Sequence, residues 1–214
     1  MTSPIPENET ERLAALEGYE ILDTPPEETF DRITRITAAY LNVPTVLVSL
    51  IDENRQWFKS HHGLDAEETP RNIAFCAHSI LNDEVLVIED AIKDKRFKDN
   101  PLVLGEPNIR FYAGAPLRTN EGFRVGTLCA IDYVPREITK AQELVLKDLA
   151  QVVVDEMELR IAGRKSAKEI AERKRLEEAH RESEERLKAR RCSGPWSTIR
   201  RLKSTSRTSR GAIP

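Results

Sequence analysis

The sequence predicts an α+β domain in which helices cover one face of an antiparallel sheet, a loop covers a pocket on the other face, and a long helix follows. Two apolar runs, 111–117 and 125–133, are separated by turn residues and predict a hairpin. Apolar side chains occur at both odd and even positions of the second run. These positions point to opposite faces of a sheet, so both faces must be covered. From Thr139, a helical pattern continues without a strong breaker as far as Gly194.

Two helices are expected before the sheet. Asn8-Glu-Thr-Glu11 has the form of a capping box, and Gly18 ends the short helix that follows it. Thr24 stands in the N-cap position of a second helix, which Asn42-Val-Pro44 ends. One face of this second helix carries Phe30, Ile33, Thr37, Tyr40 and Leu41.

The other strands come from short runs rich in β-branched residues. Residues 45–51 and 56–60 predict a hairpin around a turn at 52–55, and 85–89 predicts a further strand. The segments between the strands are expected to be a loop at 63–72, a short helix at 73–80 and a long loop at 90–108. A loop as long as 90–108 inside a compact domain indicates a functional segment or disorder.

Charge and cysteine usage exclude several functional classes. Residues 192–214 carry five basic and no acidic residues, so the rest of the chain has a net charge of −8, against −3 for the whole. An acidic domain disfavours a nucleic-acid partner. The three cysteines lie far apart, which disfavours a disulfide framework or a zinc site and favours the reducing cytoplasm. No apolar run approaches the ~18 residues of a membrane span, so no membrane partner is expected.

Several short segments carry a resemblance to a known family. In chain order they are ERLAAL, ILDTPPEETFDRIT, VSLIDENRQWFKS, ETPR, FCAHSI, DKRFKDNP, IRFYAGAPL and GTLCAID. Over residues 7–160 they resemble the GAF-domain sensors of bacterial signalling proteins. This resemblance implies a GAF-like fold and a sensory role. It leaves the ligand and any cofactor unknown, because GAF domains bind very different molecules.

The long helix expected from Thr139 onward, which we call the exit helix, has the pattern of a linker. Between Val145 and Met157, an apolar stripe can pack on the sheet or on a second copy of the helix. Residues 161–191 combine sparse 3-4 spacing with dense mixed charge, which is too polar for a strong coiled coil alone. They resemble the signalling helix that connects GAF domains to a PAS, histidine kinase or diguanylate cyclase domain. The implied partners are a second copy, paired through the C-terminal helices, and such an output domain; a solvated single helix is the alternative.

The ends of the chain differ in composition from this domain. Residues 1–6 are expected to be disordered. The tail at 192–214 has neither helical nor strand periodicity and also reads as disordered. The abrupt change near Arg190 motivates the hypothesis of a truncation or a shifted reading frame, and a functional basic tail is the alternative.

The candidate ligand site combines cationic, aromatic and polar side chains over the loop-covered face of the sheet. Such a set suits an anionic or planar ligand. The predicted ligand-binding residues are Phe58, His78, Arg96, Phe97, Asn100, Arg110, Tyr112 and Asp132. Three of these have structural alternatives: Arg96 pairing with Asp94 or Asp99, His78 on a helix surface, and Asp132 holding a turn.

Cys76 is the one redox candidate. It precedes His78 by two residues, but positions i and i+2 of a helix do not face each other, which argues against a nucleophilic pair. A free cysteine in such a run is typically a buried packing residue, and the same is expected of Cys129.

Enzyme signatures are absent from the sequence. There is no phosphate-binding loop, nucleophile elbow, zinc-protease motif or cyclase signature, so no catalytic or metal-binding residue is predicted. The sequence also lacks the marker residues of three GAF subtypes. The Asn-Lys-Phe-Asp-Glu set of cyclic-nucleotide binders is missing, and Cys76 lacks the adjoining His of bilin-binding domains. Phe111-Tyr112 replaces the strand cysteine of free-methionine sulfoxide reductases.

Together these patterns predict a cytoplasmic, non-enzymatic sensory module of a two-component or related signalling system. It would bind a small molecule or a partner and pass the change through paired C-terminal helices to an output domain. Two alternatives stay open. One is a thiol-based redox sensor, or an enzyme like the free-methionine sulfoxide reductases, that uses Cys76. The other is a ligand-free dimerisation scaffold.

Overall fold

The structure is a computed structural model that describes residues 3–192. Its elements are α1 (Glu9–Gly18), α2 (Glu28–Leu41), β1 (Thr45–Ile51), β2 (Arg55–His62), β3 (Glu68–Pro70), the 3-10 helix η1 (Arg71–Ile73), α3 (Cys76–Ser79), β4 (Leu86–Ile88), α4 (Pro101–Leu104), β5 (Phe111–Arg118), β6 (Arg124–Asp132) and α5 (Lys140–Cys192). The chain divides into two compact units, with the boundary between Ala162 and Gly163. The predicted tail from residue 193 onward lies outside the described residues.

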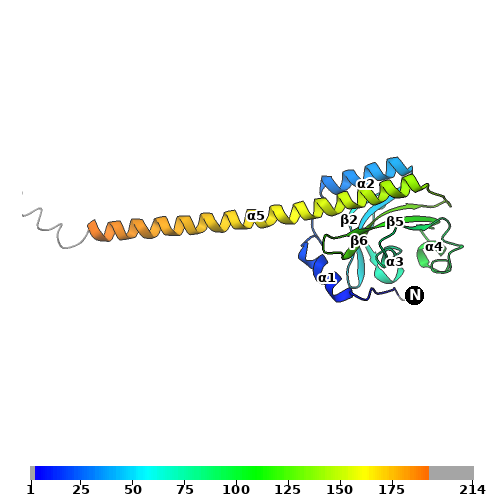
Figure 1. Ribbon diagram of the computed structural model, residues 1–214, viewed down its shortest axis with the longest axis horizontal. Helices are drawn as coiled ribbons and strands as arrows, with labels where there is room; N and C mark the ends of the chain where they lie inside the picture. The colour runs from blue at the N-terminus through cyan, green and yellow to red at the C-terminus, as the bar shows by residue number, and fades with distance from the viewer. Residues whose placement is uncertain (1–2, 193–214) are drawn as a thin grey trace, which may run out of the picture. The chain divides into compact units, whose positions relative to one another are not determined.

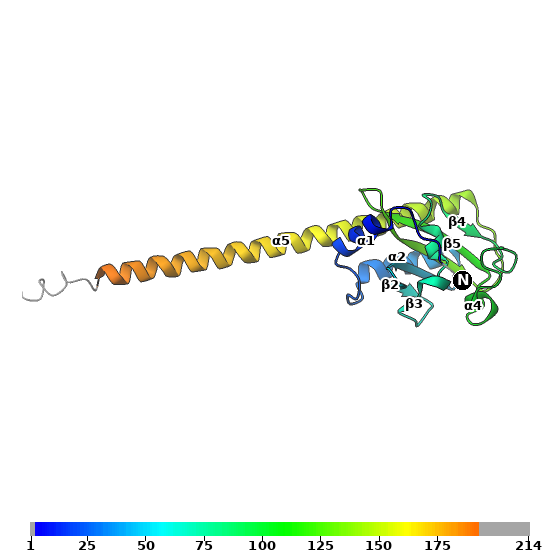
Figure 2. The same cartoon turned by 90° about the horizontal axis from the view of Figure 1, so that it is seen from below.

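The six strands form one antiparallel sheet in the order β3-β2-β1-β6-β5-β4. Every residue of the central strand β1 is buried, which accounts for the nearly continuous apolar run at 45–51. Figure 1 shows α2 and the first part of α5 on one side of the sheet and the short helices α3 and α4 on the other, and Figure 2 shows the same fold turned by 90°. The predicted α+β class, with its antiparallel sheet and long C-terminal helix, is confirmed.

One face of the sheet packs against α1, α2 and the first part of α5. Phe30 of α2 and Val153 and Met157 of α5 are almost fully buried in this core. Burying each such side chain stabilises the fold by about 1.5 to 3 kcal/mol. The predicted stripe of α5 therefore packs mainly on the sheet, while Val152 stays exposed.

The opposite face has a second, smaller core. Phe75, Ile80, Phe97 and Ile109 pack there against Leu47 and other side chains of the sheet. Phe75 and Ile80 flank α3, and Phe97 and Ile109 belong to the connection between β4 and β5, so this face is covered by short elements and no long helix of the described residues crosses it.

The central hairpin forms as predicted. The turn between β5 and β6 is closed by the Thr119 N–H donating to the Phe123 carbonyl at 2.8 Å, and Gly122 adopts a φ of +92°. Gly126 is required for a different reason, because a Cβ there would collide with the Ser49 carbonyl oxygen of β1. The close approach of β6 to β1 therefore depends on a glycine at this position.

The three predicted helix starts have different outcomes. At Thr139, a full capping box forms: its N–H donates to Gln142 Oε1 at 2.9 Å, and the Gln142 N–H donates to Thr139 Oγ1 at 3.2 Å. At Asn8, the side chain makes no capping hydrogen bond. Thr24 as an N-cap was wrong, because α2 begins after Glu27 and the Thr24 hydroxyl donates to the Ile21 carbonyl instead.

Two elements appear in segments that were expected to be loops. β3 adds a three-residue edge strand beside β2, and α4 forms one turn within the long segment 90–108. The Asn100 side chain accepts from the Leu102 N–H at 2.9 Å and so caps α4, with Pro101 in the first turn. Both elements are too short to show a period in the sequence.

A charge network around the buried Lys59 anchors α5 to the N-terminal part of the chain. Lys59 of β2 has a fully buried side chain and donates to Glu27 Oε1 at 2.6 Å. Arg160 of α5 donates to the same oxygen at 2.9 Å, and Tyr19 donates to Glu158 of α5 at 2.6 Å. We call Lys59, Glu27 and Arg160 the latch. It connects a strand of the sheet, the segment before α2 and the exit helix.

The second unit contains the rest of α5, whose described side chains from Lys165 to Ala189 are exposed. Ile170, Leu176 and Leu187 are its exposed large apolar side chains. Pairs four residues apart, such as Arg173 with Glu177 at 2.9 Å, add modest support to a helix. Across the described residues, no helix combines the length and the apolar character that a membrane span requires.

The N-terminal helix is held by a buried arginine. The Arg12 side chain, 1% exposed, donates to the Ile51 carbonyl at 2.7 Å and makes two hydrogen bonds of 2.8 Å to Glu9. Arg71 donates to the same carboxylate at 2.6 Å. Burial raises the pKa of Glu9, but the hydrogen bonds and charges of Arg12 and Arg71 outweigh it and lower the pKa from 4.5 to about 2.

We predict that Glu9→Gln destabilises the domain by about 2 to 4 kcal/mol at neutral pH, because it leaves two buried guanidinium groups without a counter-charge. The folded pKa of Glu9 lies below its unfolded value. Its contribution is therefore complete above about pH 4.5 and is lost as the pH falls toward about 2. Urea unfolding as a function of pH measures both effects. The exposed Glu11→Gln on the same helix is the control and should change stability by less than about 0.5 kcal/mol; equal effects of the two substitutions would contradict the assignment.

Candidate functional site

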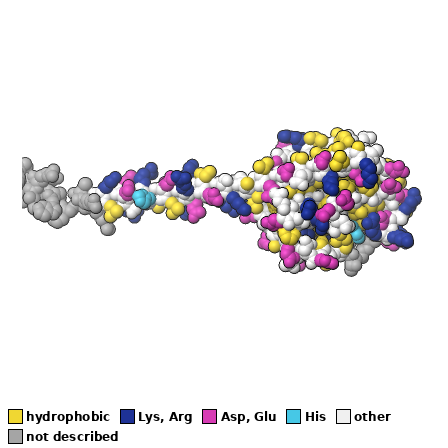
Figure 3. Space-filling model, in the orientation of Figure 1, with side chains coloured by type: hydrophobic (Ala, Val, Ile, Leu, Met, Phe, Trp, Pro, Cys, Tyr) yellow, Lys and Arg dark blue, Asp and Glu magenta, His cyan; other side chains and the backbone are white. Residues whose placement is uncertain are grey.

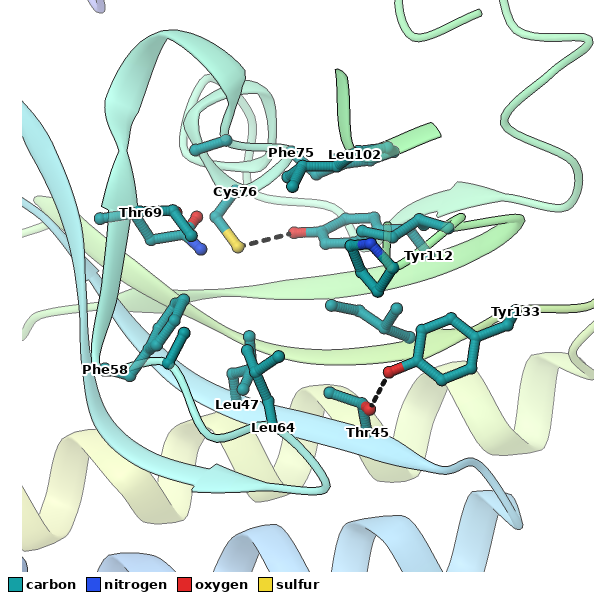
Figure 4. Close-up of a pocket in the computed structure, with 16 residues that line it drawn as sticks. Thr45, Leu47, Phe58, Leu64, Thr69, Phe75, Cys76, Leu102, Tyr112 and Tyr133 are labelled. Atoms are coloured by element: carbon teal, nitrogen blue, oxygen red, sulfur yellow. Dashed lines mark hydrogen bonds between the residues drawn. The ribbon is translucent and has the colours of Figure 1, made fainter. Parts of the chain in front are cut away.

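A cavity of about 180 Å³ lies between the second face of the sheet and the short elements that cover it (Figure 4). Strands β1, β2, β5 and β6 supply one wall, and the segments around η1, α3 and α4 supply the other. The lining residues are Thr45, Leu47, Gln56, Phe58, Leu64, Ala66, Thr69, Ala74, Phe75, Cys76, Leu102, Pro107, Ile109, Tyr112, Ile131 and Tyr133. This is the face on which the sequence predicts a loop-covered pocket.

The lining of the cavity is mostly apolar and contains no Lys, Arg, His, Asp or Glu side chain. Aromatic rings are prominent in it. Phe75 stacks on Phe97 with ring centroids 4.1 Å apart and lies 5.3 Å from the Tyr112 ring, so one wall is a rigid aromatic layer.

Polar groups meet the cavity at two places. Thr45 and Tyr133 share a hydrogen bond of 2.7 Å between their hydroxyls. Gln56 and Thr69, opposite each other in the pairing of β2 with β3, present Oε1 and Oγ1 atoms that are buried and have no hydrogen-bond partner. A buried polar atom without a partner costs about 1 to 3 kcal/mol, so this pair is a ready contact for a bound molecule.

A cluster of sulfur and hydroxyl groups lies beside the cavity. The sulfurs of Cys76 and Cys129 are 3.6 Å apart, and the Tyr112 hydroxyl lies 3.3 Å from the Cys76 sulfur. Ser79 hydrogen-bonds to the same Tyr112 hydroxyl at 2.8 Å. Gly114 makes this possible, because a Cβ there would collide with the Tyr112 hydroxyl.

The pKa of Cys76 is lowered from 9.0 to about 7. Burial raises it, and contacts of the sulfur with Cys129, Ser49, Thr127 and Tyr112 lower it by more. The hydroxyls of Ser49 and Thr127 lack the geometry of a full hydrogen bond, so we assign the lowering chiefly to Cys129 and Tyr112. The hydrogen bond to Cys76, together with burial, raises the pKa of Cys129. Cys76 is therefore the sulfur that ionises first.

The residues predicted from the sequence to form the site fall into two groups. Phe58, Cys76 and Tyr112 line the cavity. The others lie outside its lining. Phe97 supports Phe75 from behind, the half-buried His78 packs edge-on against Phe97 at 4.7 Å, and Asn100 caps α4 while donating to the Ile73 carbonyl at 2.9 Å.

The charged members of the predicted set have partners within the fold. Arg96 pairs with Asp94 at 2.6 Å, the structural alternative considered for it. Arg110 donates to the carbonyls of Val103 and Ile109. Asp132 accepts from two N–H groups that follow it and from Arg136 Nε at 2.6 Å.

Sequence reasoning missed much of the lining. Gln56 and Thr69 face the cavity only because β3 pairs with β2, and no periodicity marked that edge strand. Leu64, Leu102 and Pro107 come from segments expected to be loops. Within residues 3–192, no group of three or more His, Cys, Asp or Glu side chains could hold a metal ion.

Comparison with known families gives a direct result. The family model described as "GAF domain" matches residues 25–157. The chain belongs to the GAF domain family. The chain is 43% identical over 154 residues to a cyclic di-GMP phosphodiesterase of Pseudomonas aeruginosa. That match covers 72% of this chain and 26% of the relative, so the chain spans about a quarter of the relative's length.

Solved structures support the same fold. The GAF domain of an Acinetobacter phosphoenolpyruvate-protein phosphotransferase is 19% identical, with a TM-score of 0.52 over 76% of this chain and 97% of the other. A domain assigned to a two-component sensor histidine kinase of Sinorhizobium meliloti is 16% identical, with a TM-score of 0.51 over 66% and 97%. The PixJ GAF domain of Thermosynechococcus elongatus is 14% identical, with a TM-score of 0.53 over 66% and 90%. At these identities the likeness concerns the fold alone.

Proposed function

We propose that this GAF domain is the sensory module of a signalling protein, and that its cavity binds a small molecule. The observation that carries the proposal is the mostly apolar cavity of about 180 Å³, whose lining includes two unpartnered polar groups and no Lys, Arg, His, Asp or Glu side chain. An empty cavity of this volume lowers the stability of the folded protein by roughly 4 kcal/mol, at about 24 cal/mol per Å³ of cavity. A ligand that fills it recovers part of that free energy.

The latch provides a route from the cavity to α5. Phe58 lines the cavity, and the next residue, Lys59, holds Glu27, which also binds Arg160 of α5. A ligand that prefers one position of β2 would bias the packing of α5 through this network. Such a bias reaches an output domain if α5 leads to one.

The output is proposed from the relatives. The Pseudomonas aeruginosa relative is named a cyclic di-GMP phosphodiesterase, and most of its length lies outside the match. We place this domain in the cytoplasm, beside an output domain that acts in cyclic di-GMP signalling or in a two-component system. The catalytic step, in this proposal, belongs to that output domain.

A second copy of the chain is the proposed partner. Ile36 and Tyr40 of α2 and Leu144 and Val152 of α5 are exposed apolar side chains on the two helices that cover the same face of the sheet. Figure 3 shows hydrophobic side chains at the surface where Figure 1 places these helices. Burying this patch in a dimer removes it from water and brings two α5 helices together.

A thiol-based redox sensor is the second candidate, favoured by the 3.6 Å separation of Cys76 and Cys129. The Cys76 thiolate would attack a hydroperoxide, break its O–O bond and become a sulfenic acid. The Cys129 thiol would then displace water and form the disulfide. The two sulfurs lose two electrons and two protons in all, and the peroxide is reduced to water or an alcohol.

For the sensory proposal, we predict that some neutral small molecules raise the melting temperature of the wild-type chain by several degrees in a screen of metabolites. Ala74→Leu, which extends a buried side chain into the cavity, should abolish this stabilisation. Ala39→Leu on the exposed side of α2 is the matched control and should retain it. A screen in which nothing stabilises the protein would favour the ligand-free scaffold.

For the dimer, we expect sedimentation velocity to show a dimer at micromolar concentration. Ile36→Glu combined with Val152→Glu should convert it to a folded monomer, because two charges in an apolar interface oppose its burial. Leu104→Glu, at an exposed position of α4 on the other side of the sheet from α2 and α5 (Figure 1), is the control and should leave the dimer intact. A monomeric wild type, or a dimer that survives the double substitution, would rule out this surface.

For the redox candidate, peroxide treatment followed by mass spectrometry of the denatured protein should show one disulfide between Cys76 and Cys129. In Cys129→Ser, a dimedone-reactive sulfenic acid should accumulate at Cys76 instead, because the resolving thiol is gone. Thiols that stay reduced under peroxide while a free dithiol is oxidised would exclude this candidate.

A further inference from the structure

We propose that the ligand of the cavity is a neutral molecule built on one aromatic ring and carrying one hydroxyl group, of which phenol is the simplest case. This inference rests on the proposed function, because it assumes that the cavity is the sensory site. Four features of the cavity each narrow the ligand class independently. They are its volume, the absence of Lys, Arg, His, Asp and Glu from its lining, its aromatic wall, and the unpartnered pair Gln56 and Thr69, which we call the polar corner.

The volume of the cavity sets an upper limit on the size of the ligand. An engineered apolar cavity of about 150 Å³ binds benzene. The cavity in this domain, at about 180 Å³, has room for one ring and one or two further heavy atoms. A nucleotide, a cyclic dinucleotide or a tetrapyrrole is several times larger. The cavity must therefore hold a much smaller molecule unless the covering segments move apart.

Charge excludes ions. No Lys, Arg or His side chain lines the cavity, so an anion inside it would be buried without a counter-charge, and no Asp or Glu side chain is present to hold a cation. The nearby cationic candidates are already engaged, Arg96 with Asp94 and Arg110 with two backbone carbonyls. A carboxylate would lose its hydration without replacement.

The aromatic side chains of the lining favour a ligand with an aromatic ring. Phe58, Phe75, Tyr112 and Tyr133 all contribute aromatic surface to the lining, and Figure 4 shows these side chains around the same space. The stack of Phe75 on Phe97 fixes one wall in place. A planar ligand can make offset or edge-to-face contacts with such walls, worth about 0.5 to 1.5 kcal/mol per aromatic pair beyond burial.

The polar corner selects a hydroxyl. Gln56, 6% exposed, presents an unpartnered Oε1 that accepts only, and Thr69 opposite it has an unpartnered Oγ1–H that donates. A ligand hydroxyl can donate to the first atom and accept from the second, and so satisfies both. A hydrocarbon of the same shape would leave both unpartnered.

Isothermal titration of the full chain with phenol, benzene and benzoate tests the class. Phenol should bind about tenfold more tightly than benzene, which is the worth of two net hydrogen bonds. Benzoate should bind at least tenfold more weakly than phenol, because its charge is desolvated. Cyclic di-GMP should show no binding to this domain.

Two substitutions test the corner. Gln56→Leu and Thr69→Val should each lower the affinity for phenol severalfold toward that of benzene, while benzene binding, which also reports an intact cavity, stays within about twofold. Asn120→Leu, at an exposed position on the β5–β6 turn, should change neither affinity.

The outcomes separate this inference from the function on which it rests. Tighter binding of benzoate than phenol, an unchanged phenol-to-benzene ratio in both corner variants, or failure of both phenol and benzene to bind would overturn the ligand class. If another compound still stabilised the wild type but not Ala74→Leu, the sensory proposal would survive that loss. If no compound did, both would fail.

Discussion

The burial of both faces of the central strands β1 and β6 is the constraint on which the rest of this structure depends. The side chains at both odd and even positions of β1 are buried, so two separate cores must form, one on each face of the sheet. The side toward α1, α2 and α5 is closed by helices of ten residues or more. The other side is closed by one-turn helices and a connecting segment, which leave the cavity beside Cys76.

This asymmetry separates the core that holds the fold together from the face on which we propose that a ligand binds. The helix-covered core holds the fold together, and the ion pairs of Glu9 and Glu27 tie α1 and α5 to it. The loop-covered core has polar atoms without partners at Gln56 and Thr69. Such atoms also occur at Ser49, Thr127 and Arg71, but only Gln56 and Thr69 of these residues line the cavity. The latch connects the two sides, because β2 carries Phe58 toward the cavity and Lys59 toward α5.

The fold was largely predictable because its signals are local. The apolar run at 45–51, the turn before Gly122 and the capping box at Thr139 each correspond to one element of the structure. The site was less predictable because its geometry is not local. Cys76 and Cys129 are 53 positions apart in sequence, and their contact depends on where α3 rests on β6.

The choice of site residues shows the same limit. The sequence favoured arginines for an anionic ligand, but Arg96 and Arg110 are held by neighbouring groups. The polar corner instead consists of Gln56 and Thr69, whose types carry little signal until the pairing of β2 with β3 brings them together. Only a short edge strand makes that pairing, and its three residues have no detectable period.

Hydrogen exchange of the wild-type chain with and without saturating phenol tests the central claim most directly, that the cavity is coupled to the exit helix. The account predicts altered protection both around the cavity and in α5 between residues 150 and 162, and loss of the second effect in Glu27→Gln. Changes confined to the cavity lining, with α5 unaffected in both proteins, would contradict it.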